Sequence, residues 1–219
     1  MVTVNGIIDL VEKARSSSTK RNLIQSFELI MTLKDLDTKK NELNINETVF
    51  LPNPLSRQTK ICVFASGDLG LRAEKAKVDR VIQPDEIDLI GGNKRELRKI
   101  VRSYDFFLGE TTMMANIGKV LGRFLGPMGK MPAPIPPNAP IENMISKYRT
   151  AVRIRVRNQL AVATRVGDEQ LDDAKVAENA MVAFNIIIGK LPNAEKNLKK
   201  VAIKLSMSPP VKALATQVS

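Results

Sequence analysis

The sequence lacks histidine and tryptophan altogether and has a single cysteine, Cys62, in 219 residues. Without histidine, the chain lacks the commonest general base and the usual partner of a nucleophilic serine or cysteine. An intrachain disulfide and a Cys/His zinc site are excluded, and we expect no cofactor and no metal. Cys62 lies in the apolar run KICVFA, which indicates a buried small hydrophobe rather than a nucleophile. Catalysis by carboxylates or lysine stays formally open, although spacing singles out no pair of them.

Long apolar runs are also missing, since none approaches the roughly 20 residues needed to span a bilayer. The N-terminal MVTVNGIIDLVEKAR has neither the basic start nor the long apolar core of a signal peptide. We therefore expect a cytoplasmic protein with no membrane partner.

Positive charge dominates the composition of the chain. Lys and Arg number 34 against 23 Asp and Glu, a net charge of +11, which is typical of a polyanion binder. Aromatic residues make up only 4%, which argues against a protein that stacks many unpaired bases on an aromatic platform. A folded RNA bound through its shape, sugars and phosphates fits better.

The pattern of apolar residues divides the chain into three parts. Before a Pro-rich boundary near residue 58, it predicts a helix over 4–15 and strands over 27–36 and 48–51. The middle has βαβ rhythm, with strands at 61–65, 80–82 and 105–108. The intervening helices are expected at 68–77, 85–101 and 111–124, with Asp68, Asp85 and Thr111 near plausible N-caps. A short helix at 141–148 follows the Pro-rich residues 132–140.

The last part reads as β structure again. VRIRV and LAVATRV are separated by residues 157–159, a spacing typical of a hairpin, and a helix over 172–188 and a strand over 201–205 follow. Each flank of roughly 60 residues is small for an independent core, so both can form one α+β domain around an inserted middle.

Residues 117–137, IGKVLGRFLGPMGKMPAPIPP, are the most unusual stretch. Their glycines permit close approach and positive φ, and their prolines stop any helix, so we expect a stiff, exposed, basic loop. A nucleotide-binding P-loop would need Ser or Thr after Lys130, where Met131 stands. A plain helix cap would need only one of the glycines. The candidate secondary RNA contacts here are Lys119, Arg123, Gly126, Gly129 and Lys130.

Three arginines, Arg153, Arg155 and Arg157, alternate with Ile154 and Val156. Period two places the guanidinium groups on one sheet face, where each can hold phosphate oxygens in a bidentate fork. A merely solvated basic face remains the alternative.

A second basic cluster lies on the helix expected over 85–101. Lys94, Arg95, Arg98, Lys99 and Arg102 form a stripe, which we interpret as a solvated helix face, because charge runs on helices usually face water.

The glycine-rich run resembles the signature of the L1 family of large-subunit ribosomal proteins. The resemblance continues, most like the archaeal branch, through QSFELIMTLKDLD (25–37), NKRELRKIVRSYDFFL (93–108) and VAIKLSMSPPVK (201–212). It implies a two-domain α/β and α+β fold. A discontinuous α+β RNA-binding domain would comprise 1–59 and 152–219, and a Rossmann-like α/β domain with a small parallel sheet would be inserted at 60–151.

In that family, ribosomal RNA contacts a strand-start Phe and a Thr-Met-Gly turn. The corresponding residues are Phe27, with Ser26 beside it, and Ser206, Met207 and Ser208. Ser208 departs from the family's Gly, which bears on how closely an RNA backbone approaches. We expect these residues to form one surface patch with an exposed Met207, flanked by Lys204 and Lys212. A strand end followed by a tail is the plainer interpretation of SMSPP.

The resemblance also implies a function. We expect a non-enzymatic structural protein that binds large-subunit ribosomal RNA at the mobile stalk, near the exit site, and contacts exit-site tRNA indirectly. It would also repress translation by binding its own mRNA, and it would be a monomer off the ribosome. The rival is a nucleotide-dependent α/β enzyme that uses the middle domain. It is disfavoured because Ser66-Gly-Asp-Leu-Gly70 lacks the G-x-G-x-x-G fingerprint.

Overall fold

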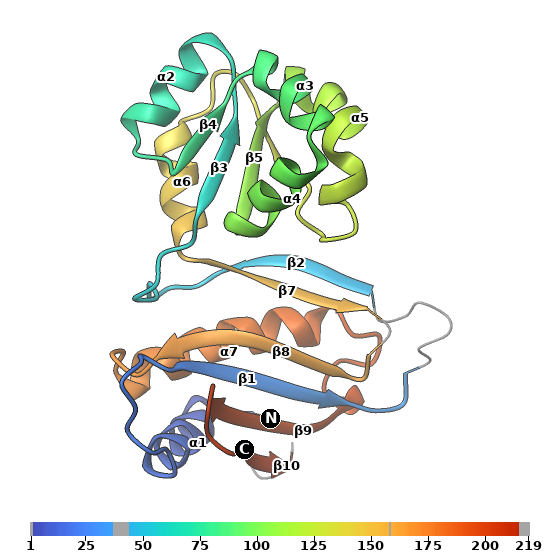
Figure 1. The fold of residues 1–219 in the computed structure, drawn as a ribbon. Coiled ribbons are helices and arrows are strands. Elements are labelled where there is room, and N and C mark those ends of the chain that lie inside the picture. Colours follow the sequence, from blue (N-terminus) through green and yellow to red (C-terminus); the bar gives the residue numbers. More distant parts are fainter. Residues whose placement is uncertain (1, 37–43, 158, 215–219) are drawn as a thin grey trace. The chain divides into compact units, whose positions relative to one another are not determined.

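A computed structural model describes residues 2–36, 44–157 and 159–214. The chain divides into two compact units (Figure 1). Unit 1 comprises Met1–Arg57 and Thr150–Ser219, and unit 2 comprises Gln58–Arg149.

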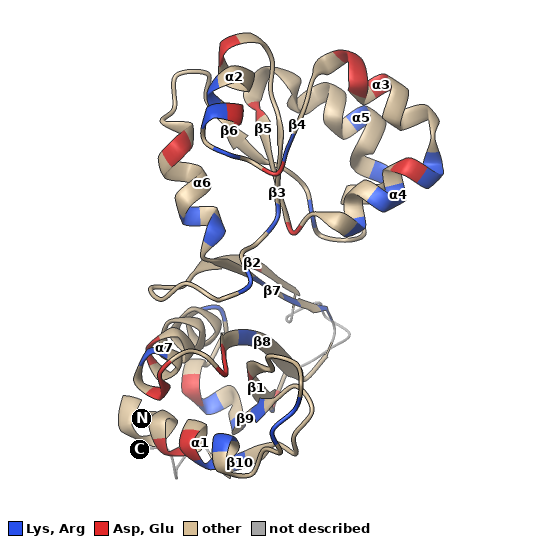
Figure 2. Ribbon diagram, turned by 60° about the vertical axis from the view of Figure 1, so that its left-hand side comes forward, with Lys and Arg blue, Asp and Glu red and all other residues tan. Residues whose placement is uncertain are grey.

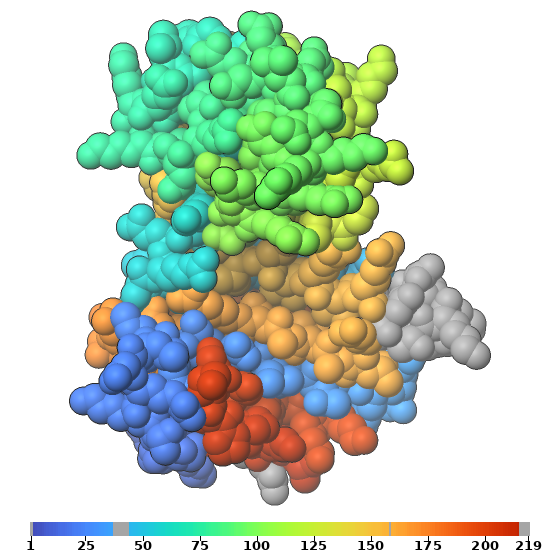
Figure 3. Space-filling model, in the orientation of Figure 1, coloured from blue at the N-terminus to red at the C-terminus, as the bar shows by residue number. Residues whose placement is uncertain are grey.

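Unit 1 is an α+β assembly with two antiparallel sheets. A four-stranded sheet has the order β10-β9-β1-β8, and a separate two-stranded sheet pairs β2 with β7. Its elements are α1 (Val4–Ser16), β1 (Ser26–Leu33), β2 (Asn44–Phe50), β7 (Ala151–Arg157), β8 (Ala161–Asp168), α7 (Asp173–Gly189), a 3-10 turn (Ala194–Asn197), β9 (Leu198–Leu205) and β10 (Val211–Leu214). In Figure 3 the C-terminal segment, in red, lies beside the N-terminal segments, in blue.

The four-stranded sheet buries one face only. Along β1 every second side chain is buried, namely Phe27, Leu29, Met31 and Leu33. The helices α1 and α7 pack against each other, against β9 and β8 respectively, and belong to the same apolar core. Among the described residues no helix covers the opposite face of this sheet.

Arg15 ties the end of α1 to the start of α7. Its Nε donates to Asp173 Oδ1 at 2.8 Å, and its two terminal nitrogens donate to the carbonyl oxygens of Glu169 and Leu171, both at 2.8 Å. The guanidinium carbon also lies 5.1 Å from the centre of the Phe27 ring, within range of a cation–π interaction.

Unit 2 is an α/β assembly with one parallel sheet, in the order β4-β3-β5-β6. Its elements are β3 (Ile61–Phe64), α2 (Gly67–Lys75), β4 (Arg80–Ile82), α3 (Pro84–Gly92), α4 (Lys94–Ser103), β5 (Phe106–Glu110), a 3-10 turn (Thr111–Met113), α5 (Met114–Leu125), β6 (Ala133–Ile135) and α6 (Ile141–Arg149). The two ends of the unit are held together, because Arg149 Nη1 donates to the Thr59 carbonyl at 2.6 Å and Thr59 Oγ1 donates to the Tyr148 carbonyl at 2.7 Å. Together the two units confirm the predicted fold class.

The helix predicted over 85–101 is two helices, α3 and α4, separated at Asn93. The Asn93 side chain accepts hydrogen bonds from the backbone N–H groups of Arg95 and Glu96, and so begins a new helix. The N-caps of α2 and α3 lie two residues before Asp68 and Asp85. Ser66 precedes α2, Gln83 precedes α3, and α5 begins only after the 3-10 turn that contains Thr111.

The predicted hairpin of VRIRV with LAVATRV was also wrong. β7 pairs with β2, and β8 pairs with β1, so the two strands enter different sheets. Residue 158 of their connection lies outside the described residues. Two short strands were missed: β6, an edge strand that tolerates Pro134, and β10, which returns along β9. SMSPP is therefore the turn of a β9–β10 hairpin rather than the start of a tail.

Cys62 is fully buried in β3, as predicted. Burial raises the pKa of its thiol to about 12, so the reactive thiolate is essentially absent at neutral pH.

Candidate nucleic-acid interface

The uncovered side of the four-stranded sheet, called here the open face, presents small side chains in its centre and cations around them. Ile30 of β1 lies between Ala202 of β9 and Ala163 of β8, and Thr32 lies between Lys200 and Ala161. Alanines thus flank Ile30 on both sides and Thr32 on one.

Four cations and one carboxylate give the open face its charge. Glu28 of β1 is paired in register with Lys204 on one side and Arg165 on the other. Lys200 and Lys212 are exposed, and Lys212 lies opposite Ala202 on the edge strand β10. The open face therefore favours an anionic partner.

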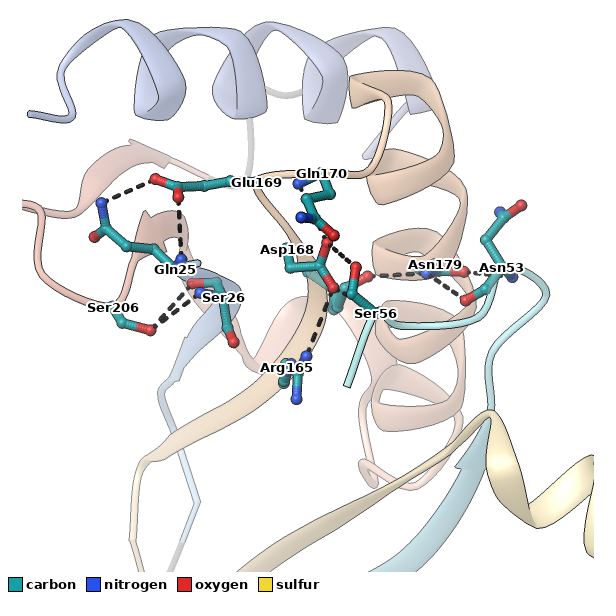
Figure 4. Close-up of polar contacts among 11 residues, drawn as sticks. Gln25, Ser26, Asn53, Ser56, Arg165, Asp168, Glu169, Gln170, Asn179 and Ser206 are labelled. Carbon is teal, nitrogen blue, oxygen red and sulfur yellow. Dashed lines mark hydrogen bonds and ion pairs between the residues drawn. The ribbon is translucent and has the colours of Figure 1, made fainter. Parts of the chain in front are cut away.

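The turn that follows β9 is fixed to the start of β1 (Figure 4). The Ser206 backbone N–H donates to the Ser26 carbonyl at 3.1 Å, and the Ser206 hydroxyl also bonds to Ser26. The Met207 backbone N–H donates to Gln25 Oε1 at 3.0 Å, and Gln25 Nε2 in turn donates to Glu169 Oε1 at 2.9 Å. These bonds hold the turn while leaving the Met207 side chain 57% exposed, as the sequence predicts.

A second polar cluster fixes the end of β8 (Figure 4). Asp168, 1% exposed, accepts hydrogen bonds from the backbone N–H and the hydroxyl of Ser56, both at 2.8 Å, and lies 3.6 Å from the guanidinium group of Arg165. The Asn179 side chain bonds to both backbone groups of Asn53. The chain that leaves β2 is thereby held against β8 and α7.

Phe27 does not lie on the surface. Its side chain is fully buried, between the neighbours Leu205 and Gly167 in the sheet, because β1 alternates and Phe27 shares the core side with Leu29. The expected patch of Phe27 with Ser206, Met207 and Ser208 therefore needs correction: the strand start and the turn do meet, but Ser26 rather than Phe27 contacts the turn.

Ser208 fits its position without backbone strain. It is not among the described residues with positive φ, its N–H donates to the Leu205 carbonyl at 3.0 Å, and it is 9% exposed. A Gly is thus not required here by φ.

Arg153, Arg155 and Arg157 share one face of β7, as the period-two pattern predicts, while Ile154 and Val156 are buried on the other. The three arginines lie opposite the polar residues Thr48, Asn46 and Asn44 of β2. This row belongs to the two-stranded sheet and not to the open face.

The glycine-rich run is half helix. Lys119 and Arg123 lie one turn apart on the exposed side of α5, and Gly118 and Gly122 beside them leave open space where a Cβ would be. The helix ends in a tight turn in which Gly129 has φ +66°, a value that glycine adopts most easily.

Lys130, expected from the sequence to be a secondary RNA contact, binds backbone carbonyls of its own unit instead. Its ammonium group donates to the carbonyl oxygens of Val101 at 2.8 Å and Tyr104 at 2.6 Å, at the end of α4. A cation there satisfies carbonyl groups that a helix end leaves unpaired. Lys130 thus has a structural role in unit 2 that needs no RNA.

The place where a doubly wound fold binds nucleotides is occupied by a carboxylate. Strand order reverses between β3 and β5, and at their carboxyl ends Glu110 accepts hydrogen bonds from the Ser66 N–H at 3.0 Å, the Ser66 hydroxyl at 2.8 Å and the Thr112 hydroxyl at 2.7 Å. These bonds, that of Thr112 foremost, lower the pKa of Glu110 despite its burial. A charged carboxylate beside the start of α2 repels a phosphate, which argues against the nucleotide-dependent enzyme.

Within the described ranges, no group of three or more acidic or cysteine side chains could hold a metal ion. The residues that sequence reasoning missed are Glu28, Thr32, Arg165, Lys200 and the positioning residue Gln25. Their alternation along each strand was visible, but the pairing of strands from opposite ends of the chain was not.

Fold and surface together define a two-domain basic protein of mixed α/β structure, with a discontinuous α+β unit that exposes a cationic sheet face. Residues 11–209 match the family model described as "Ribosomal protein L1p/L10e family". This chain belongs to that family, which consists of structural ribosomal proteins and not of enzymes.

Its relatives include archaeal proteins named "Large ribosomal subunit protein uL1". The chain is 45% identical to that of Cenarchaeum symbiosum over 99% of both chains. It is 40% identical to that of Thermofilum pendens, with 97% of this chain and 94% of the relative covered. The protein of Archaeoglobus fulgidus is 37% identical over 98% of this chain and its own whole length. The archaeal character expected from the sequence is confirmed.

Proposed function

We propose that this protein is a structural component of the large ribosomal subunit in the cytoplasm, where unit 1 binds large-subunit ribosomal RNA through the open face and the turn 206–210. Membership of the L1p/L10e family over nearly the whole chain carries the proposal. The cations around the small residues of the open face and the net charge of +11 support it. None of the described helices is long and apolar enough to cross a membrane.

Within this surface, the residues divide by role. Lys200, Lys204, Lys212 and Arg165 neutralise phosphates, while Met207 makes apolar contact beside the hydroxyl of Ser206. Ser26 holds the turn through its backbone N–H and carbonyl, and Phe27 supports the strand from within the core.

Three finer proposals rest on the resemblance of the segments 25–37, 93–108, 117–137 and 201–212. The protein lies at the mobile stalk near the tRNA exit site, so that it influences departing tRNA indirectly. The same surface binds its own messenger and represses translation. Off the ribosome the protein is a monomer. A fourth proposal rests on the pattern of basic residues: Lys119 and Arg123 on α5, and the row Arg153, Arg155 and Arg157, supply secondary phosphate contacts.

Filter binding with the full chain tests the proposal. A transcript of the stalk segment of large-subunit ribosomal RNA is compared with a small-subunit transcript of equal length and with a DNA copy. We expect preference for the first, weaker binding of DNA because ribose hydroxyls are lost, and a salt slope of several units at roughly 0.7 to 0.9 per neutralised phosphate. Equal affinity for all three probes contradicts the proposal.

A pair of matched variants localises the surface. Met207→Asp places a carboxylate in the turn, where we expect a loss of about tenfold or more, equivalent to about 1.4 kcal/mol. Leu71→Asp is the control, because Leu71 of α2 is 59% exposed, close to the 57% of Met207, and lies in unit 2. Similar losses for both variants would remove the open face and its turn from the proposal.

A further inference from the structure

The helix α4 carries an unusual concentration of like charge. Figure 2 shows basic positions along its length and a single acidic one. At 100° per residue, the five cations Lys94, Arg95, Arg98, Lys99 and Arg102 fall within an arc of about 140°. Leu97, Ile100 and Val101 occupy the buried side.

None of these five cations has a carboxylate within 4.0 Å among the residues that the structure describes. Three pairs are four residues apart, Lys94 with Arg98, Arg98 with Arg102, and Arg95 with Lys99, and like charges at that spacing destabilise a helix. The buried side of the helix and its two ends offset this repulsion, because the Asn93 side chain caps the first turn and Lys130 binds the Val101 and Tyr104 carbonyls. A solvated face, the interpretation favoured from sequence, gives no reason to gather repelling charges on one side.

These cations also border a groove, called here the basic groove, of about 1130 Å³. Besides the five on α4, Arg80 of β4 lines it, and Glu96 is the only carboxylate among the lining residues. The half-buried Tyr104 and the buried Ile100 are the two side chains of the lining that are mainly apolar. Arg80 has a carboxylate partner only at 3.8 Å, in Glu86.

We propose that the basic groove of unit 2 binds the phosphate backbone of an RNA strand, as a second contact separate from the open face. Lys94, Arg98 and Arg102 follow one another at about 6 Å along the helix. That is about the separation of successive phosphates in an RNA strand, so each of the three can meet one phosphate. An acidic protein partner fits less well, because protein interfaces depend on apolar anchors in pockets. Most of the side chains that line this groove are cations, and of its two mainly apolar ones Ile100 is buried. The proposal deepens the proposed function, since it adds a surface for the same class of ligand.

The test compares two variants of the full chain with equal loss of charge in unit 2. The groove variant is Lys94→Gln with Arg98→Gln and Arg102→Gln. The control is Lys60→Gln with Lys75→Gln and Lys77→Gln, whose exposed side chains lie outside the groove. Circular dichroism verifies that both remain folded.

The probe is a 20-nucleotide oligouridylate, titrated at several salt concentrations. Loss of three contacts should lower the log–log salt slope by about 2, at roughly 0.7 per phosphate of a single strand, and the affinity by about 100-fold at 0.1 M salt if the 1 M value is unchanged. The control should keep the slope of the unaltered chain. Photocrosslinking of 4-thiouridine-substituted oligonucleotide should label the peptide that contains Tyr104.

Equal affinities and slopes for the two variants overturn the inference, as does preferential loss of polyglutamate binding in the groove variant. The Met207→Asp effect on the ribosomal transcript is measured separately. If that effect persists while the groove variant behaves like its control, only the groove fails. If the groove result holds and Met207→Asp has no effect, the assignment of the open face fails instead.

Discussion

Phe27→Ala is the sharpest test of the corrected view of the turn. The ring is fully buried, between strand neighbours on both sides and under the guanidinium group of Arg15 at 5.1 Å. Replacing a buried Phe by Ala costs about 3 to 5 kcal/mol, which includes the cavity left behind. Against a typical domain stability of about 5 to 15 kcal/mol, unit 1 should stay folded but with a much smaller reserve.

The measurement is urea unfolding of the full chain, with hydrogen exchange of β1 and β9 amides to assign the transition to unit 1. With a slope of about 2 kcal/mol per molar urea, a loss of 4 kcal/mol moves the midpoint by about 2 M. Phe27→Leu is the control, since it keeps most of the apolar volume and should cost less than about 1.5 kcal/mol. Both variants should bind ribosomal RNA normally once the folded fraction is accounted for.

The opposite pattern would refute the reasoning. A Phe27→Ala protein with an unaltered midpoint and severely reduced RNA affinity would mean that the ring faces the RNA, as the family resemblance first suggests. An equal loss of RNA affinity in Phe27→Leu would point the same way.

Three further predictions concern single side chains. Ser208→Gly should keep or improve affinity for ribosomal RNA if close approach decides, whereas a loss of about 0.5 to 1.5 kcal/mol in filter binding would mean that the hydroxyl makes its own contact. The stability that the buried Cys62 thiol contributes is present below the pKa of the unfolded chain and is lost as pH rises towards about 12. Above about pH 9 the free energy of unfolding should therefore fall by at most about 1.4 kcal/mol per pH unit. In urea titrations at several pH values, Cys62→Ala should lack this slope. Glu110→Gln should cost unit 2 about 1 to 3 kcal/mol at pH 7, because charge-assisted bonds from Ser66 and Thr112 are lost. Since the folded pKa of Glu110 is lowered, that contribution is present above the ordinary carboxyl pKa and is lost as pH falls through the lowered one. A difference in stability that persists in strong acid would contradict it.

Local sequence patterns predicted most of the helices and strands of this fold. They did not predict which strands pair when the partners are far apart in the sequence. The alternation in β1 and β7 and the βαβ rhythm of unit 2 are short-range signals, and they were read correctly. The hairpin of β7 with β8 was wrong because a short connection does not decide which strand supplies the apolar partner, and Val152 instead pairs with Val49. The prediction of one helix over 85–101 was wrong because Asn93, which caps a new helix, lies within a periodic run. In such a run a capping Asn is easily taken for an ordinary surface residue.

The candidate site divides in the same way. Met207 was expected to be exposed and is, because turns between strands face solvent. Phe27 was misplaced although its alternation with Leu29 was visible, because the resemblance was given more weight than the period-two rule. The open face itself could not be found, since Lys200, Thr32 and Ala161 come from three strands that only the tertiary fold brings into register.

The central place of β1 in its sheet has a consequence for synthesis of the chain. Both of its neighbours, β8 and β9, come from the last third of the sequence, so about 170 residues must be added after Leu33 before β9 is complete. At roughly 5 to 20 residues per second this takes about 10 to 35 s, during which the apolar row of β1 has no partner strands. All elements of unit 2 lie between these points, and its ends are held together by Thr59 and Arg149, so it can fold while unit 1 waits. A prematurely terminated chain would then contain a folded unit 2 without the four-stranded sheet of unit 1.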